Sequence, residues 1–240
     1  MKVTLLIPIL NEATGMRQVM PQIKPEWYDQ LIILDGGSTD GGLEYAREQG
    51  YEVVVQERKG LRHGYQQVRS LLTGDVIVTF SPDGNSIPEL IPPLIEKMKE
   101  GYDMVIVSRY CQGAKSEDDD LVTAFGNWMF TSLINLLFGS RYTDTMVLFR
   151  AYKTELIGRL GLTQETAYRR PERLFRTSVS WEPLLSVRCA KYKLNVTEIP
   201  GDEPKRIGGE RKLQPFRWGA TYLWQVMSEF FCQDGFRMGD

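Results

Sequence analysis

Phe80-Ser81-Pro82-Asp83-Gly84-Asn85 ends an apolar run, residues 76–80, at a proline and a glycine. This pattern predicts a buried strand that stops in a tight turn. The turn presents Asp83 and Asn85 at the carboxyl end of the strand, where α/β sheets bind their ligands. Two oxygen-bearing side chains at i and i+2 can share a hard divalent cation, which in turn can hold a diphosphate. A plain turn explains the same stretch, so the choice between a turn and a metal site depends on other parts of the sequence.

Short apolar and β-branched runs on either side of this stretch alternate with helical patterns. Strands that alternate with helices predict one mostly parallel sheet covered on both faces. A chain of 240 residues, 42% of them hydrophobic, is long enough for one large α/β domain. The predicted strands are residues 2–7, 31–34, 52–55, 76–80, 104–107 and 194–199, and the predicted helices are 14–23, 41–48, 61–72, 87–99, 122–138, one that starts at 180–185, and 216–231.

Composition excludes several classes of protein. A net charge of −2 gives no electrostatic case for binding nucleic acid. The three cysteines have no CxxC spacing, so the sequence indicates neither a disulfide framework nor a zinc site and favours a reducing compartment. The apolar start, residues 3–10, resembles a strand and not a signal peptide. Residues 128–138 are too short an apolar run for a span of about 20 residues, so we expect a cytoplasmic protein.

Two further polar clusters follow predicted strands, Pro8-Ile9-Leu10-Asn11-Glu12 and Asp35-Gly36-Gly37-Ser38-Thr39-Asp40. Because parallel strands end at the same edge of the sheet, both clusters should lie beside Asp83. Asn and Asp side chains can bind the polar groups of a base and a ribose, and the glycines allow close approach of the backbone. Each cluster also has a simpler interpretation, since Asn11, Ser38 and Asp40 can cap helices.

With these three clusters the sequence resembles the family 2 glycosyltransferases of GT-A fold, the Rossmann-like fold of nucleotide-diphospho-sugar transferases. It is most similar to their polyprenyl-phosphate (dolichol-phosphate) mannosyltransferase branch, over residues 2–213. The resemblance implies a nucleotide-sugar site that includes Asp83 of an Asp-x-Asp motif, which holds Mg²⁺ or Mn²⁺ on the donor diphosphate. Asn85 replaces the second carboxylate; its amide oxygen can coordinate a metal but adds no charge, which predicts weaker metal binding. The other donor-site residues that the resemblance implies are Pro8, Asn11, Glu12, Asp35, Ser38, Asp40 and Gly84.

Two basic segments complete the expected donor site. Residues 57–64 open a helix with Lys59 and Arg62, and a helix start with cations is a reasonable anion site. His63, the single histidine, is either a base or a solvated loop residue. Residues 206–213 resemble the family's Arg-x-x-Gly-Glu-Ser-Lys-Leu loop, so Arg206 and Lys212 are expected to close over the diphosphate.

The acceptor side is expected from four further matches to family motifs. Arg109 and Tyr110 lie in a Val-Ser-Arg-Tyr segment, Asn127 lies in the long helix, Arg150 ends an Asp-x-x-x-x-Phe-Arg segment, and Glu182 matches an acidic residue near the acceptor. Glu182 is alternatively a first-turn acid of its helix. One departure lies in the acidic loop 113–120, which we expect to be mobile. There Asp119 replaces an arginine of the polyprenyl-phosphate enzymes, and a carboxylate repels a phosphate.

The resulting hypothesis is an enzyme that transfers a sugar from a GDP- or UDP-sugar by metal-assisted inverting displacement. Asp83, Glu182 and Arg206 would be its catalytic residues. The acceptor is a polyprenyl phosphate, or a sugar hydroxyl with Glu182 as general base. A nucleotide-sugar-binding protein without turnover is an alternative that Asn85 favours. A nucleotidyltransferase would require a glycine-rich loop after the first strand, which residues 9–13 do not provide.

The tail divides the chain into a glycosyltransferase domain, 1–214, and a C-terminal segment, 215–240. The spacing of its apolar residues predicts an amphipathic helix over 216–231. Its apolar face is expected to pack on the domain, on a second subunit of a homodimer, or on the inner face of a membrane. That face comprises Phe216, Ala220, Leu223, Met227, Phe230 and Phe231, opposite Arg217, Thr221, Gln225 and Glu229.

Overall fold

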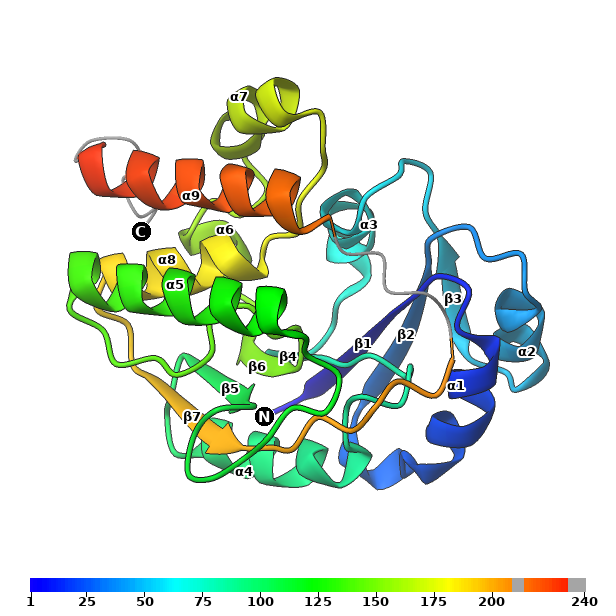
Figure 1. Cartoon of the computed structure of the whole chain (residues 1–240). Helices are drawn as coiled ribbons and strands as arrows, with labels where there is room; N and C mark the ends of the chain where they lie inside the picture. Colours follow the sequence, from blue (N-terminus) through cyan, green and yellow to red (C-terminus); the bar gives the residue numbers. More distant parts are fainter. Residues whose placement is uncertain (209–213, 233–240) are drawn as a thin grey trace.

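The computed structural model describes residues 1–208 and 214–232, and its centre is a seven-stranded sheet of order β3-β2-β1-β4-β6-β5-β7 (Figure 1). Only β6 runs antiparallel to its neighbours, β4 and β5. The strands β1, β2 and β4 therefore end side by side at one edge. The strands are β1 (Val3–Ile9), β2 (Gln30–Asp35), β3 (Glu52–Val55), β4 (Val76–Thr79), β5 (Met104–Ser108), β6 (Arg150–Lys153) and β7 (Val196–Pro200).

Helices cover both faces of this sheet (Figure 1). The α-helices are α1 (Ala13–Val19), α2 (Gly42–Glu48), α3 (Leu61–Val68), α4 (Ile91–Lys99), α5 (Leu121–Phe138), α6 (Leu156–Arg159), α7 (Thr166–Phe175), α8 (Glu182–Lys191) and α9 (Pro215–Phe231). Short 3₁₀ turns are η1 (Met20–Gln22), η2 (Pro25–Trp27), η3 (Arg69–Leu71) and η4 (Pro88–Leu90).

Alternation of buried side chains along the strands creates two apolar layers. Leu5 and Ile7 of β1 pack with α1, α2 and α4, whereas Leu6 of the same strand packs with α3, α5, α6, α8 and α9. Successive side chains of a strand point to opposite faces, so continuous apolar runs are the expected sequence of such doubly covered strands. The predicted α/β sheet with helices on both faces is confirmed.

The differences from prediction lie mainly in the second half of the chain. Strand β6 and helices α6 and α7 were not predicted, and β6 enters the sheet between β4 and β5. Its sequence, Arg-Ala-Tyr-Lys, has no apolar run because Arg150 is a buried member of it. The strand expected at 194–199 is β7, and the helix expected at 122–138 is α5, which begins with an Asp120–Thr123 capping box.

Helix α9 forms where the tail pattern predicts it but turns its other face inward. Thr221 and Gln225, expected on the outer polar face, are buried, while Phe216 and Phe231 are exposed. The buried face combines polar and apolar contacts: Gln225 donates to the Ala167 carbonyl of α7, and Tyr222 and Val226 belong to the core. Helix α9 packs on the domain, but through a different face from the predicted apolar one.

Candidate active site

The loops after β1 and β2 are joined by side-chain hydrogen bonds at the edge of the sheet. The Asn11 amide oxygen accepts from the Thr39 N–H at 2.8 Å, and the Ser38 hydroxyl accepts from the Asn11 N–H at 3.0 Å. Asp40 accepts from Ala13 and Gly42, the first residues of α1 and α2. The capping interpretation thus describes Asp40, while Asn11 and Ser38 fasten one loop to the other.

Asp35 has the same kind of local role. Its carboxylate is fully buried and accepts the N–H groups of Gly37 and Ser38 at 3.0 and 3.1 Å. This turn presents Gly36 and Gly37 to a large cavity, beside Pro8 and Glu12. The sequence prediction places all of these residues together correctly, but the backbone and Glu12 form the wall of the cavity, and the Asp35, Ser38 and Asp40 side chains support it from behind.

The turn after β4 carries Asp83, whose carboxylate is almost completely buried. The Asn85 N–H donates to it at 3.2 Å, and Gly84 between them has a φ of +91°, which favours glycine. The segment 203–208 crosses directly over this turn. Ile207 donates its N–H to the Asp83 carbonyl at 2.8 Å, and a Cβ on Gly84 would overlap the Ile207 side chain.

Arg206 pairs with the Asp83 carboxylate. The contact joins Nη1 and Oδ2 at 2.9 Å, and a second contact at 3.8 Å joins Arg206 to Asp118 of the acidic loop. The same loop is fastened to the crossing segment through Glu203, because Glu203 donates its N–H to Lys115 and accepts from Glu117 through its carbonyl. Arg206 therefore lies between the Asp83 turn and the acidic loop.

The Asp83 turn supplies oxygen ligands of the kind that Mg²⁺ and Mn²⁺ prefer. They are the Asp83 carboxylate and the Asn85 amide oxygen, which accepts from Ser86 at 3.3 Å. Within residues 1–208 and 214–232 no three His, Cys, Asp or Glu side chains cluster closely enough to hold a metal. These residues fit an ion that takes its other ligands from a diphosphate and water, which is the usual arrangement for Mg²⁺.

Arg109 is the centre of a second, carboxylate-rich cluster at the cavity. Its guanidinium contacts Asp144 at 2.6 Å, Glu203 at 3.3 Å and Asp119 at 3.4 Å. Burial lowers the pKa of Arg109, but Asp144 and the other carboxylates outweigh this and hold the pKa above its ordinary value. Burial raises the pKa of Glu203, against the opposing effect of Arg109. The charge of Arg109 is therefore shared by three acids, and its predicted role on the acceptor side stays a prediction.

Asp119, the departure from the family pattern, faces the cavity. Its carboxylate accepts a hydrogen bond from the Tyr110 hydroxyl, and its N–H donates to Ser116 at 3.0 Å. Burial, followed by the hydrogen bond to Asp119, raises the pKa of Tyr110. Asp119 therefore lines the cavity, and its position beside an acceptor stays a prediction.

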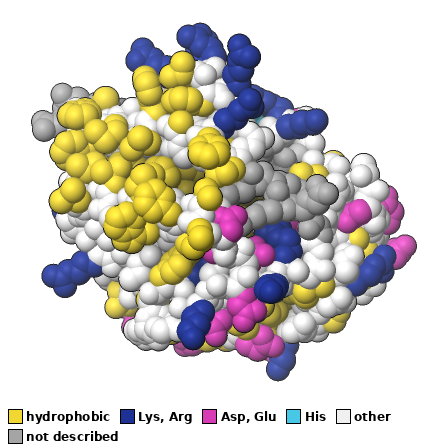
Figure 2. Space-filling model, in the orientation of Figure 1, with side chains coloured by type: hydrophobic (Ala, Val, Ile, Leu, Met, Phe, Trp, Pro, Cys, Tyr) yellow, Lys and Arg dark blue, Asp and Glu magenta, His cyan; other side chains and the backbone are white. Residues whose placement is uncertain are grey.

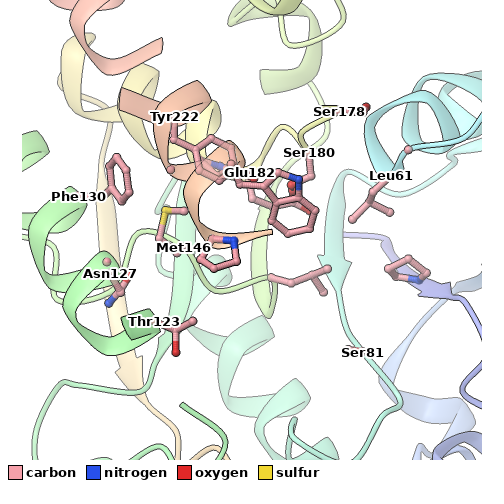
Figure 3. A pocket seen from close by; sticks show the side chains of 18 of the residues that line it. Leu61, Ser81, Thr123, Asn127, Phe130, Met146, Ser178, Ser180, Glu182 and Tyr222 are labelled. Atoms are coloured by element: carbon pink, nitrogen blue, oxygen red, sulfur yellow. The ribbon is translucent and has the colours of Figure 1, made fainter. Parts of the chain in front are cut away.

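The cavity has a volume of about 930 Å³ and extends from the loops after β1 and β2 to the space between α5 and α9 (Figure 3). This is the size of small-molecule and cofactor sites. Its outer half is apolar, with Phe130, Met146 and Tyr222 among the lining side chains. Asn127 of α5 lines the same half; its side chain is buried, and its Oδ1 accepts no hydrogen bond within the described residues.

Glu182 stands at the first position of α8 and also lines the cavity (Figure 3). It is 2% exposed, and its carboxylate accepts hydrogen bonds from Tyr65 at 2.8 Å and from Ser180. Burial, together with the charge of Glu182, raises the pKa of Tyr65 well above its usual value, so Tyr65 is a fixed donor to this carboxylate. Glu182 is therefore a first-turn acid of α8 that also lines the cavity, and its role beside an acceptor stays a prediction.

Two arginines expected at the site face elsewhere, which corrects the prediction. Arg62 is fully buried and pairs with Glu165 at 2.7 Å and Glu172 at 2.8 Å, so its charge is already neutralised. Arg150 is also fully buried and donates to the Ser186 hydroxyl and to the Glu182 carbonyl. It supports the start of α8 and does not line the cavity.

The two predicted basic segments also contain His63, Lys59 and Lys212. The His63 ring contacts the Lys59 carbonyl through Nδ1 at 2.8 Å and does not line the cavity. Lys59, predicted with Arg62 as a cation of an anion site at this helix start, does line the cavity. Lys212 lies outside the described residues.

Glu203 is the site residue that sequence reasoning missed. It approaches Asn85 at 3.4 Å as well as Arg109, and so links the donor turn to the acceptor cluster. A signal was available, because Glu203 follows β7 at the same edge of the sheet as Asp83. The rule that polar residues after parallel strands meet at one edge applies to this loop as well.

Comparison with known proteins agrees with this arrangement. A family model described as glycosyl transferase family 2 matches residues 4–161. The chain is 31% identical over 194 residues to the dolichyl-phosphate hexose transferase of Haloferax volcanii, covering 80% of this chain and 77% of that protein. It is 29% identical to the dolichol-phosphate mannosyltransferase of Pyrococcus furiosus, covering 89% of this chain but 60% of that longer protein.

A solved structure resembles the whole fold. Glucosyl-3-phosphoglycerate synthase from Mycobacterium tuberculosis, crystallised with Mn²⁺, UDP and phosphoglyceric acid, has a TM-score of 0.72 to this chain. It is 20% identical, and the match covers 98% of this chain and 80% of that one. At this identity the likeness concerns the fold alone, and it confirms the GT-A prediction.

Proposed function

The chain belongs to glycosyltransferase family 2, and we propose that it transfers a sugar from a nucleotide-diphosphate sugar to a polyprenyl phosphate. The observation that carries the choice of acceptor is the shape of the cavity. One end is formed by the loops after β1, β2 and β4, and the other is an apolar space between α5 and α9. A nucleotide fits the first end by its polar groups and glycine backbone, and a hydrocarbon chain fits the second.

The proposed reaction is a direct displacement at the anomeric carbon. An oxygen of the acceptor phosphate forms a bond to that carbon, and the bond from the carbon to the nucleotide diphosphate breaks on the opposite side. A phosphate monoester is already an anion at neutral pH, so this route requires no general base. Among relatives of this chain, the names of the Haloferax and Pyrococcus proteins state transfer to or from dolichyl phosphate lipids, which supports the same acceptor class.

On the donor side, Asp83 and Asn85 would hold a divalent ion, which when bound neutralises charge on the diphosphate. Arg206 would add a cation as the nucleotide leaves, a stabilisation that is electrostatic and requires the donor to be positioned in advance. Lys212, in the predicted lid, would have the same role. The Gly36-Gly37 turn lines the cavity, and its lack of side chains would let the base or ribose approach the backbone closely.

On the acceptor side, Arg109 and Lys59 are the cations that line the cavity within the described residues. Arg109 contacts three carboxylates, so a phosphate would have to replace Asp119, the most distant of the three contacts. Asn127 would accept a hydrogen bond from a hydroxyl of the sugar, because its buried Oδ1 accepts none within the described residues.

A second candidate is transfer to a hydroxyl, favoured by the position of Glu182. Its carboxylate is buried in the cavity wall, where it could take the proton of an attacking hydroxyl. Two hydroxyl groups already donate to this carboxylate, and an acid at a helix start has a sufficient structural reason to be present. We therefore assign Glu182 to positioning in the phosphate mechanism.

Comparing Glu182→Gln with the parent enzyme separates the two mechanisms. Rates are measured with GDP- and UDP-sugars on polyprenyl phosphate and on a sugar acceptor, with the exposed Glu100→Gln as the control. The phosphate mechanism predicts transfer to polyprenyl phosphate that Glu182→Gln lowers by less than about tenfold. A loss of about 10²-fold or more, the usual contribution of a general base, with activity on the sugar acceptor only, would contradict it.

A further inference from the structure

Helices α5 and α9 expose a continuous apolar surface, which we call the apolar platform (Figure 2). It contains some of the most exposed large apolar side chains of the chain, among them Leu121 at 90%, Phe216 at 85% and Leu136 at 81%. The two helices pack against each other, so their outer faces adjoin (Figure 1). The platform comprises Leu121, Val122, Phe125, Trp128, Leu136, Phe216, Leu223, Trp224, Phe230 and Phe231. An exposed apolar patch of this kind marks an interaction surface.

The apolar side chains of the platform face outward, whereas polar side chains of α9 face the interior of the protein. In α9 Thr221 and Gln225 face inward, and Glu229 is held by Arg188 at 2.6 Å and Lys191 at 2.9 Å. Residues 121–138 of α5 include no charged side chain. The Glu229 carboxylate is thus held in ion pairs away from the platform, and the surface that remains is apolar.

Exposed arginines of α7 adjoin one margin of the platform, and α7 packs directly on α9 (Figure 2). They are Arg169, Arg170 and Arg173, together with Arg176, the residue that follows the helix. None of the four forms an ion pair with another residue in 1–208 or 214–232. The neighbouring acids Glu165 and Glu172 are occupied by Arg62, so the margin is basic overall. An apolar face beside a cationic margin is complementary to a surface of anionic lipids.

The cavity opens on the same surface. Val122, Phe125, Phe216 and Leu223 belong to the platform and also line the cavity. A lipid whose headgroup reaches the interior of the cavity could therefore leave its chain among the platform side chains. This connection between a binding cavity and an exposed apolar face distinguishes the platform from an ordinary dimer surface.

We propose that the apolar platform and the α7 arginines dock the enzyme on an anionic lipid bilayer, so that the acceptor enters the cavity from the membrane. The inference rests on the proposed function for the identity of the acceptor, but the docking itself does not require it. Helix α5 is long and apolar enough to cross a membrane by length and composition, the one such helix among the described residues. Because Phe130, Ile134 and Phe138 of α5 pack in the same core as α8 and α9, we place it along the interface.

The test is flotation of the full chain with vesicles that contain no polyprenyl phosphate and no donor. One set is pure phosphatidylcholine, and the other contains one part phosphatidylglycerol to two parts phosphatidylcholine. The apolar variant combines Trp128→Ser, Leu136→Ser and Phe231→Ser, which do not line the cavity. The charge variant combines Arg169→Gln, Arg170→Gln and Arg173→Gln, and its matched control removes three exposed cations elsewhere, Lys2→Gln, Lys24→Gln and Arg47→Gln.

We expect the parent to bind anionic vesicles and the charge variant to bind them at least about tenfold more weakly, since basic side chains near an anionic surface strengthen binding. The apolar variant should lose binding to both vesicle types, and the control should bind like the parent. If the control variant lost as much binding to anionic vesicles as the charge variant, the result would contradict the proposal that the α7 side of the protein faces the membrane. A parent that floats with neither vesicle type but sediments as a dimer that the apolar variant dissociates would assign the platform to a second copy of the chain. Docking without any transfer to polyprenyl phosphate would refute the proposed acceptor and leave the platform assignment intact.

Discussion

Replacing Arg206 by glutamine should change metal binding and sugar transfer in opposite directions. In the structure Arg206 contacts the Asp83 carboxylate, the group assigned to the metal, at 2.9 Å. A metal that binds without the donor must displace Arg206 from Asp83 and leaves the arginine without an anion. When the metal binds together with the donor, Arg206 can contact the diphosphate instead. Arg206 therefore opposes binding of the free metal and supports binding of the metal with the nucleotide sugar.

The size of the effect follows from the contact. A hydrogen bond between charged groups contributes about 1.5–3 kcal/mol, and each 1.4 kcal/mol is about tenfold in an equilibrium constant. Asp83 is 3% exposed, but the Arg206 side chain is 20% exposed and water weakens the contact, so the lower end applies. Arg206→Gln should raise the affinity for Mn²⁺ alone about tenfold. The rate of sugar transfer should fall by at least as much, because the leaving diphosphate loses a cation.

Mn²⁺ affinity can be measured by electron paramagnetic resonance of the free ion, with and without nucleoside diphosphate, and transfer by release of nucleotide. The neighbouring Lys205→Gln, an exposed cation, is the matched control. The crossing segment should keep its place in the variant because the Ile207 N–H still donates to the Asp83 carbonyl. An unchanged or weaker affinity of Arg206→Gln for Mn²⁺ alone would refute the reasoning.

Two further changes test the acceptor cluster. Asp119→Asn should lower the KM for polyprenyl phosphate, because Arg109 loses one of its carboxylate partners and can bind the phosphate more easily. The expected decrease is about two- to fivefold, the effect of removing one ion pair of ordinary strength. A raised KM would show instead that Asp119 helps to bind the acceptor. Burial raises the pKa of Glu203, so the folded protein binds its proton more tightly than the unfolded chain does, and this contribution to stability is lost as the pH rises from the ordinary glutamate value through the raised one. The free energy of unfolding of Glu203→Gln minus that of the parent, from urea titrations, should therefore increase across that window and level off above it, and a difference that is constant with pH would disprove the assignment.

The donor edge of the site could be predicted from sequence because its signal is local. Asp83 follows an apolar run within a few residues, and the parallel order of strands brings the loops after β1, β2 and β4 to one edge without any knowledge of long-range contacts. The local roles of Asp35 and Asp40, which accept backbone N–H groups near themselves, are of the same kind.

The errors concern side chains whose partners are distant in sequence. Arg62 meets Glu165 and Glu172 more than 100 positions away, so no local pattern separates a buried ion pair from an anion site. In α9 the periodicity identifies two faces but not the one that packs. The packed face includes Glu229, whose partners Arg188 and Lys191 lie 41 and 38 positions away in α8.

The proposed function is tested most directly by the choice of acceptor of the unmodified enzyme. Radiolabelled GDP-mannose and UDP-glucose are incubated with Mn²⁺ and vesicles that contain either a polyprenyl phosphate or the polyprenol of the same chain length, and the lipid fraction is counted. We predict that label enters the lipid from at least one donor when the phosphate is present and not when the alcohol replaces it. Equal labelling of the alcohol, or release of nucleotide with no labelled lipid from either acceptor, would contradict the proposed function.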